Sequence, residues 1–168
     1  SLAAAIVQER YEREAMASAF RILGEGQLSL TKFLLLTDSS AGVDLKDFRA
    51  TLTHILERTT PQTDLFVFPN LSMDTLDYTT PTINRGSKGV WMGLGDPVRE
   101  LPREFRPAVP PPSDVTDVRV FCAGCLVVGA RPFAEDREAA ARLAAHPAFE
   151  GWPLIVISDE PERATRSA

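Results

Sequence analysis

The sequence predicts an α/β fold in which a mixed β-sheet is flanked by helices. Apolar runs of strand length alternate along the chain with segments whose apolar residues have helical spacing. The clearest runs lie at 32–37, 64–68 and 152–157. The chain has 168 residues, 44% of them hydrophobic and 24% charged, which suits a domain with its own core and excludes a disordered chain.

The first predicted element is a helix over residues 3–23. This segment is rich in alanine, glutamate and arginine, and its apolar residues recur at helical spacing. Gly24 and Gly26 follow and are expected to end the helix.

A strand at 32–37, a helix to about Arg58 and a strand at 64–68 are predicted next. Asp44 is expected as the N-cap of this helix, with Asp47 in its first turn. The strands alternate with helices, so we expect them to be parallel.

Beyond residue 96 the pattern becomes a connector and then a second set of elements. Six prolines fall within 97–112, which predicts an extended connector. An apolar stretch at 118–128 precedes an expected helix at 135–145 and a strand at 152–157. Asp159 and Pro161 indicate the start of another helix, and we expect the chain to be truncated within it.

Composition excludes several classes of function. The net charge of −5 leaves no electrostatic footprint for nucleic acid. The longest apolar runs are too short to span a bilayer and the N-terminus lacks the form of a signal peptide, so a cytoplasmic location is expected. Two cysteines exclude a disulfide framework and fit a reducing compartment.

The densest cluster of polar and glycine residues is the window 75–96. It holds four threonines and four glycines between two apolar segments. Its RGSKGVWMGLG segment allows two interpretations: a phosphate cradle, or a glycine-rich turn with Trp91 and Met92 in the core. The spacing matches neither a Walker loop nor a dinucleotide fingerprint, which favours the turn.

The chain does not offer a catalytic or metal-binding set of its own. Only two histidines are present, which argues against a Ser-His-Asp site or a multi-histidine metal site. Cys122 and Cys125 form a CxxC pair that could be a redox or metal motif, but no further ligands stand nearby and packing is favoured. Asp74 and Asp77 are interpreted as surface or capping residues rather than an acid–base pair.

Several motifs resemble the C-terminal domain of UbiD-like decarboxylases. In chain order these are QLSLTKFLLLTD, DLKDF, TLDYTTPTINRGSKG, FCAGCLVV and GWPLIVISD. The resemblance implies an enzyme that removes or adds a carboxylate on aromatic or α,β-unsaturated acids, including acids of ubiquinone and menaquinone synthesis. Where many members read S-P-V-x-G-L-G-S-K, this chain reads TPTINRGSK, so its substrate need not be a polyprenyl hydroxybenzoate.

The resemblance also implies a division of labour. Prenylated FMN, its divalent metal and potassium, and a Glu-Arg-Glu catalytic network belong to an N-terminal flavin domain that this chain does not match. We therefore expect no catalytic residue, metal or cofactor on this chain, and no activity from it alone. Its expected partners are that flavin domain of the same polypeptide, other copies in a homo-oligomer, and a small aromatic acid. The alternative is a stand-alone α/β interaction domain.

Carried over by position, the resemblance assigns roles to twelve residues. Residues 1–26 would be a connector helix, and 27–168 the C-terminal α/β domain. The substrate-pocket wall would be formed by Leu28, Ser29, Thr31, Leu71 and Met73. Domain closure would involve Tyr78, Thr79, Thr80, Pro81, Gly86, Ser87 and Lys88.

Overall fold

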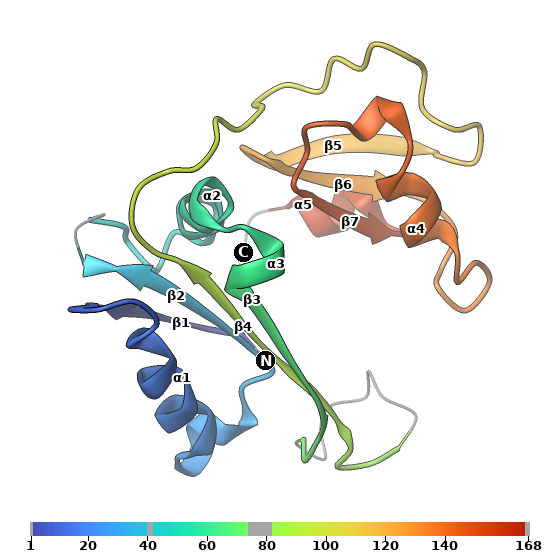
Figure 1. Ribbon diagram of the computed structural model, residues 1–168. Coiled ribbons are helices and arrows are strands. Elements are labelled where there is room, and N and C mark those ends of the chain that lie inside the picture. Colours follow the sequence, from blue (N-terminus) through green and yellow to red (C-terminus); the bar gives the residue numbers. More distant parts are fainter. Residues whose placement is uncertain (1, 40–41, 74–81, 167–168) are drawn as a thin grey trace. The chain divides into compact units, whose positions relative to one another are not determined.

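The chain folds into two units, each with its own β-sheet (Figure 1). The computed structural model describes residues 2–39, 42–73 and 82–166. Unit 1 covers residues 1–99 and holds a four-stranded sheet, while unit 2 covers 100–168 and holds a three-stranded one. Both sheets are mixed and carry helices, which confirms the predicted fold class.

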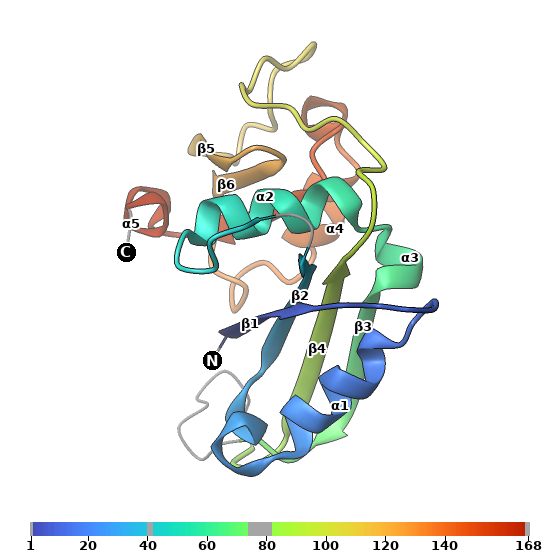
Figure 2. The same cartoon turned by 90° about the vertical axis from the view of Figure 1, so that its left-hand side faces the viewer.

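Unit 1 has the sheet order β1-β2-β4-β3. Its elements in chain order are β1 (Leu2–Val7), α1 (Ala15–Gly24), the 3-10 helix η1 (Gly26–Leu30), β2 (Phe33–Asp38), α2 (Phe48–Arg58), α3 (Pro61–Asp64), β3 (Leu65–Leu71) and β4 (Gly86–Gly93). Helix α1 lies on one face of the sheet, and α2 crosses the ends of β2 and β4 (Figure 2).

The core of unit 1 lies between α1 and the two central strands. Strands β2 and β4 have neighbours on both sides, so their apolar runs are buried. Leu34, Leu36 and Val90 pack against Ala15 and Ala19 of α1. The two alanines let the helix approach the sheet closely, and this close contact fixes its position.

The predicted helix over 3–23 is wrong in its first part. Residues 2–7 form β1, which pairs in parallel with β2, and α1 begins only at Ala15. Alanine-rich sequence favours a helix in isolation, but pairing with a preformed strand overrides such a weak preference. The segment 1–26 is therefore not one connector helix, because its first strand belongs to the sheet.

The expectation of parallel strands holds for only part of unit 1. Strand β2 pairs in parallel with β1 and β4, whereas β3 pairs antiparallel with β4. Strands β2 and β3 are not neighbours, because β4 is inserted between them. The strand at 86–93 was not predicted, since its three glycines interrupt the apolar pattern.

The glycines of β4 allow other groups to approach its backbone, so the predicted glycine-rich turn is wrong there. A Cβ atom on Gly93 would lie 2.6 Å from the Cα atom of Ile55 in α2. A Cβ atom on Gly89 would lie 3.1 Å from the Phe33 ring. Glycine in a strand interior often marks such a close approach.

Helix α2 is fixed to β4 by polar contacts as well as by packing. The buried His54 donates from Nε2 to the carbonyl of Gly93 at 3.0 Å, and the Thr59 hydroxyl donates to the Met92 carbonyl at 3.0 Å. The N-cap is Asp47, whose carboxylate accepts from the Ala50 amide, and not Asp44 as predicted.

Unit 2 has the sheet order β5-β6-β7. Its elements are β5 (Asp117–Cys122), β6 (Cys125–Gly129), α4 (Ala139–Ala144), the 3-10 helix η3 (Pro147–Phe149), β7 (Leu154–Ser158) and α5 (Pro161–Thr165) (Figure 1). The central β6 is buried along its whole length and packs with Leu143 and Phe149. The helix predicted at 135–145 is shorter than expected.

A Gly93→Ala substitution should destabilise unit 1 by about 1–3 kcal/mol, because the added methyl would meet the backbone of α2. Gly24→Ala is the matched control. That position has open space and lies in a helix, so alanine should be neutral or stabilising there. Urea unfolding of the two variants would measure both effects, and equal midpoints would contradict the role given to Gly93.

Acid should weaken the contact between α2 and β4 through His54. Burial lowers the pKa of His54 below 6.5 in the folded chain. At pH values between this lowered pKa and 6.5, the unfolded chain therefore binds the proton more tightly than the folded chain does. The unfolding free energy should therefore fall as the pH falls through this range. His54→Gln should remove that part of the pH dependence in unfolding curves taken between pH 7 and about pH 4.

Candidate functional site

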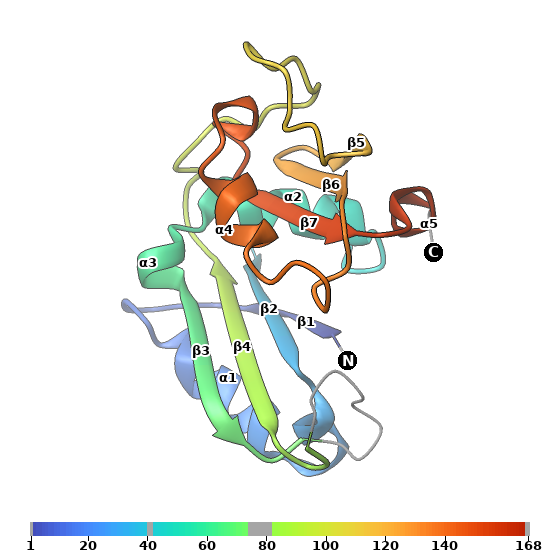
Figure 3. The same cartoon turned by 90° about the vertical axis from the view of Figure 1, so that its right-hand side faces the viewer.

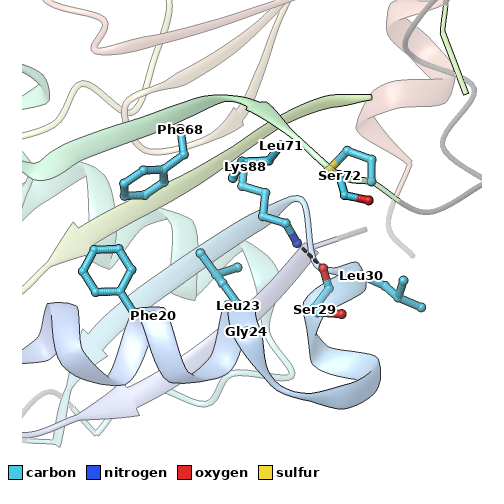
Figure 4. Close-up of a pocket in the computed structure, with 10 residues that line it drawn as sticks. Phe20, Leu23, Gly24, Ser29, Leu30, Phe68, Leu71, Ser72 and Lys88 are labelled. Carbon is cyan, nitrogen blue, oxygen red and sulfur yellow. Dashed lines mark hydrogen bonds between the residues drawn. The ribbon is translucent and has the colours of Figure 1, made fainter. Parts of the chain in front are cut away.

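A cavity of about 470 Å³ opens on the α1 face of unit 1 (Figure 4). Three parts of the fold meet around it: the C-terminal half of α1 with η1, the end of β3 with the residues after it, and the start of β4. The lining residues are Phe20, Leu23, Gly24, Ser29, Leu30, Phe68, Leu71, Ser72, Met73 and Lys88.

The apolar wall comes from α1 and β3. The rings of Phe20 and Phe68 meet edge to face with their centroids 5.7 Å apart. Strand β3 has a bulge between Phe68 and Leu71, where Asn70 has a φ of 57°. Because the bulge adds a residue to the strand, it changes the alternation and places Leu71 in the cavity lining beside Phe68.

Among the described residues that line the cavity, Lys88 is the one that carries a charge, and it is only 6% exposed. It stands on β4 opposite Phe68. Its ammonium donates to the carbonyl of Ser29 (Figure 4). It also donates, at 3.0 Å, to the carbonyl of Thr31. Desolvation lowers the pKa of Lys88, and no carboxylate among the described residues forms an ion pair with it.

The hydrogen bonds of Lys88 join the start of β4 to the segment between η1 and β2. That segment is also held locally, since the Ser29 hydroxyl donates to the Gly26 carbonyl at 2.6 Å. On the other side, the amide of the buried Met73 donates to the Asn84 carbonyl at 3.2 Å. The cavity walls are therefore fixed by hydrogen bonds to backbone carbonyls, two from the Lys88 side chain, one from the Ser29 hydroxyl and one from the Met73 amide.

The residues named from the resemblance fall into four groups. Ser29, Leu71, Met73 and Lys88 line the cavity. Leu28 is half exposed and Thr31 is buried, and neither side chain is part of the lining. Gly86 and Ser87 lie in β4. Tyr78, Thr79, Thr80 and Pro81 lie outside the described residues.

Sequence reasoning missed the aromatic part of the wall. Phe20 and Leu23 lie three positions apart on α1, a spacing that places them on one helical face. That spacing could have indicated a second apolar face of α1, but the face that packs on the sheet is formed by Ala15 and Ala19. Phe68 was predicted in a strand, but without its partner across the cavity it gave no signal of a site.

The described residues contain no group of three or more histidine, cysteine, aspartate or glutamate side chains that could hold a metal ion. Cys122 and Cys125 are opposite each other in the hairpin of β5 and β6, on either side of its turn. Asp74 and Asp77 lie outside the described residues. No helix in the described part of the chain is long and apolar enough to cross a membrane.

The chemistry of the cavity suits a small apolar molecule that carries a negative charge. The described walls are largely aromatic and aliphatic, and the Lys88 ammonium is held in a desolvated position where electrostatic interactions are stronger than in water. The structure thus defines an α/β protein with a largely apolar pocket that contains a desolvated lysine.

The comparisons with known proteins show the family. Residues 1–93 match the family described as 3-octaprenyl-4-hydroxybenzoate carboxy-lyase C-terminal domain. The chain therefore belongs to the UbiD family of decarboxylases, as the motifs predicted. The matched residues fall within unit 1, which also contains the cavity.

Curated relatives cover nearly the whole chain. A protein of Chlamydia pneumoniae, named as a subunit of 4-hydroxybenzoate decarboxylase, is 46% identical over 99% of this chain and 27% of its own length. An uncharacterized protein of Chlamydia trachomatis is also 46% identical, over 99% of this chain and 28% of its own. The chain thus spans about a quarter of the length of these relatives.

Solved structures share the fold. The vanillic acid decarboxylase of Sedimentibacter hydroxybenzoicus in its open form has a TM-score of 0.51 and 22% identity, and the match covers 65% of this chain and 23% of that one. Its closed form also has a TM-score of 0.51, with 19% identity over 85% of this chain and 26% of that one.

Replacing Lys88 should change how stability depends on pH. In the folded chain the pKa of Lys88 is lowered from its ordinary value of 10.5. At pH values between the lowered pKa and 10.5, the unfolded chain therefore binds the proton more tightly than the folded chain does. The unfolding free energy of the wild type should rise with pH in that range relative to Lys88→Met. Denaturant unfolding above about pH 8 would measure it, with the exposed Lys46→Met as control. Parallel profiles for wild type and Lys88→Met would contradict the desolvated position.

Proposed function

We propose that this chain is the C-terminal, substrate-facing part of a UbiD-like carboxy-lyase that acts on an aromatic or α,β-unsaturated acid. The observation that carries the proposal is the cavity of unit 1, with an apolar wall and one desolvated cation. The name of the chlamydial relative and that of the solved decarboxylase both refer to small aromatic acids, which supports this substrate class.

Within this proposal the cavity walls hold the apolar body of the acid. Phe20 and Phe68 would contact an aromatic ring, and Leu71 and Met73 would limit its size. Lys88 would act as a positioning residue: it holds the Ser29 and Thr31 carbonyls and keeps a positive charge at the wall, where it would attract a carboxylate. These contacts bind and orient the acid and exclude water.

The cofactor would belong to the rest of the longer enzyme. The family resemblance implies that the prenylated FMN, its divalent metal and potassium would be held by an N-terminal flavin domain. When bound, the cofactor supplies the electronic chemistry of decarboxylation. Closure of the two domains around the substrate, assembly into a homo-oligomer, and a place in ubiquinone or menaquinone synthesis are further parts of the proposal.

The pocket wall can be tested in the longer enzyme loaded with prenylated FMN. Met73→Ala and Leu71→Ala should enlarge the cavity and shift the ratio of kcat/KM values between small and bulky substituted benzoates by about tenfold or more, because each removes several methylene-sized groups. Val98→Ala is the control, since Val98 is exposed and lies outside the lining. An unchanged substrate preference in both pocket variants would refute the assignment.

The division of labour has its own test. The 168-residue chain mixed with prenylated FMN and 4-hydroxybenzoate should release no carbon dioxide, whereas the longer enzyme should do so under the same conditions. Carbon dioxide release by the chain alone would show that the chemistry does not depend on another domain.

A further inference from the structure

The amine of Lys88 has unusual surroundings for a lysine. The chain has three lysines, at positions 32, 46 and 88. Lys88 lines the cavity and is 6% exposed, whereas Lys46 is exposed. Lys88 stands near the start of β4, and Figure 3 shows η1 and the end of β3 at the same end of the unit 1 sheet. Its amine is therefore enclosed by elements of one unit.

The hydrogen-bond acceptors around this amine match its neutral form. An ammonium has three N–H donors, whereas a neutral amine has two donors and a lone pair. The described residues supply two acceptors, which are the carbonyls of Ser29 and Thr31. These satisfy both donors of the neutral amine, but the third N–H of the ammonium has no acceptor among the described residues. The neutral amine thus keeps its lone pair for reaction.

No charge on the described part of the lining offsets that of the ammonium. The other described lining residues are apolar, apart from Ser29 and Ser72, and none of them is titratable. Burial without a counter-ion disfavours the charged form, and desolvation lowers the pKa of Lys88 accordingly. Desolvation in an apolar pocket is one way in which proteins activate a lysine to react with carbonyl compounds.

The cavity walls indicate an aromatic partner for the amine. The Phe20 and Phe68 rings meet edge to face, and a third ring can pack against such a pair in the same way. Leu23 and Leu71 add aliphatic surface to a cavity of about 470 Å³. An aromatic aldehyde presents a flat apolar ring and a reactive carbonyl carbon, and it has no charge that must leave water on entry.

We propose that Lys88 is a covalent binding site for small aromatic aldehydes, which it holds as an imine. The Nζ lone pair forms a bond to the carbonyl carbon. Both N–H protons then leave with the aldehyde oxygen as water while the C=N bond forms, so the step needs no oxidant or reductant. Uptake of a proton from solvent gives an iminium, whose one N–H can donate to the carbonyl of Ser29 or Thr31.

This site goes beyond the proposed function and does not depend on it. An acid in the cavity would pair with the ammonium of Lys88 and supply the third acceptor that the ammonium lacks among the described residues. An aldehyde reacts instead with the neutral amine. Both ligands would occupy the same walls, so they would compete.

Reductive trapping tests the site in the 168-residue chain. The chain is incubated at neutral pH with 4-hydroxybenzaldehyde and cyanoborohydride, which reduces the imine to a stable secondary amine. Peptide mass spectrometry then separates Lys88 from Lys32, Lys46 and the N-terminal amine. Lys88 should be labelled about tenfold or more faster than the exposed Lys46, because more of its amine is neutral at this pH.

The aldehyde class is tested by repeating the measurement with acetaldehyde. The ratio of aromatic to aliphatic labelling should be higher at Lys88 than at Lys46. Phe20→Ala should lower that ratio at Lys88 by about threefold or more and leave it unchanged at Lys46, because the variant removes one ring of the wall.

Labelling of Lys88 that is no faster than that of Lys46 would overturn the proposal. An equal ratio of aromatic to aliphatic labelling at the two lysines would also overturn it. Both comparisons are made within the wild-type chain, so neither depends on the folding of a variant. Labelling of Lys88 that 4-hydroxybenzoate does not slow would support the aldehyde site and count against the acid site of the proposed function.

Discussion

The close packing around β4 is the constraint on which the rest of unit 1 depends. This strand has neighbours on both edges and touches other elements on both faces. At Gly93 the backbone of α2 lies where a side chain would otherwise be, and at Gly89 the Phe33 ring does the same. At Lys88 the strand instead extends a long side chain to the carbonyls of Ser29 and Thr31. The glycines and the lysine together set how closely the surrounding elements can approach.

The cavity follows from this arrangement. The start of β4 is joined to η1 by Lys88, while the bulge of β3 brings Leu71 beside Phe68. The result is an apolar pocket with one desolvated ammonium. Desolvation lowers the pKa of Lys88, and in such a position a positive charge attracts an anion more strongly than it would in water. The pocket lies in the part of the chain that matches the family, and this coincidence supports its assignment to substrate binding.

The two faces of the unit 1 sheet carry different sets of residues, because successive side chains of a strand point to opposite faces. The residues that face α1 form the core and one wall of the cavity. Their neighbours on the opposite face include Leu2, Phe33 and Val67, which are half exposed or more. A single strand such as β4 thus contributes Lys88 to the candidate substrate site on one face and Gly89, which lies against the Phe33 ring, to the other.

The sequence by itself determined the family, the fold class and the buried strands. The apolar runs at 32–37 and 152–157 predict strands because such runs suit burial in a sheet, and the motifs around Thr31 and Lys88 identify the family. Only the tertiary structure decided that residues 2–7 form a strand and that β4 is central. Alanine and glycine carry little local preference for a strand, so pairing and packing with distant residues had to supply it. The cavity was hidden for the same reason: Ser29, Leu71 and Met73 were named from the resemblance, but Phe20 and Phe68 meet only when α1 packs on the sheet.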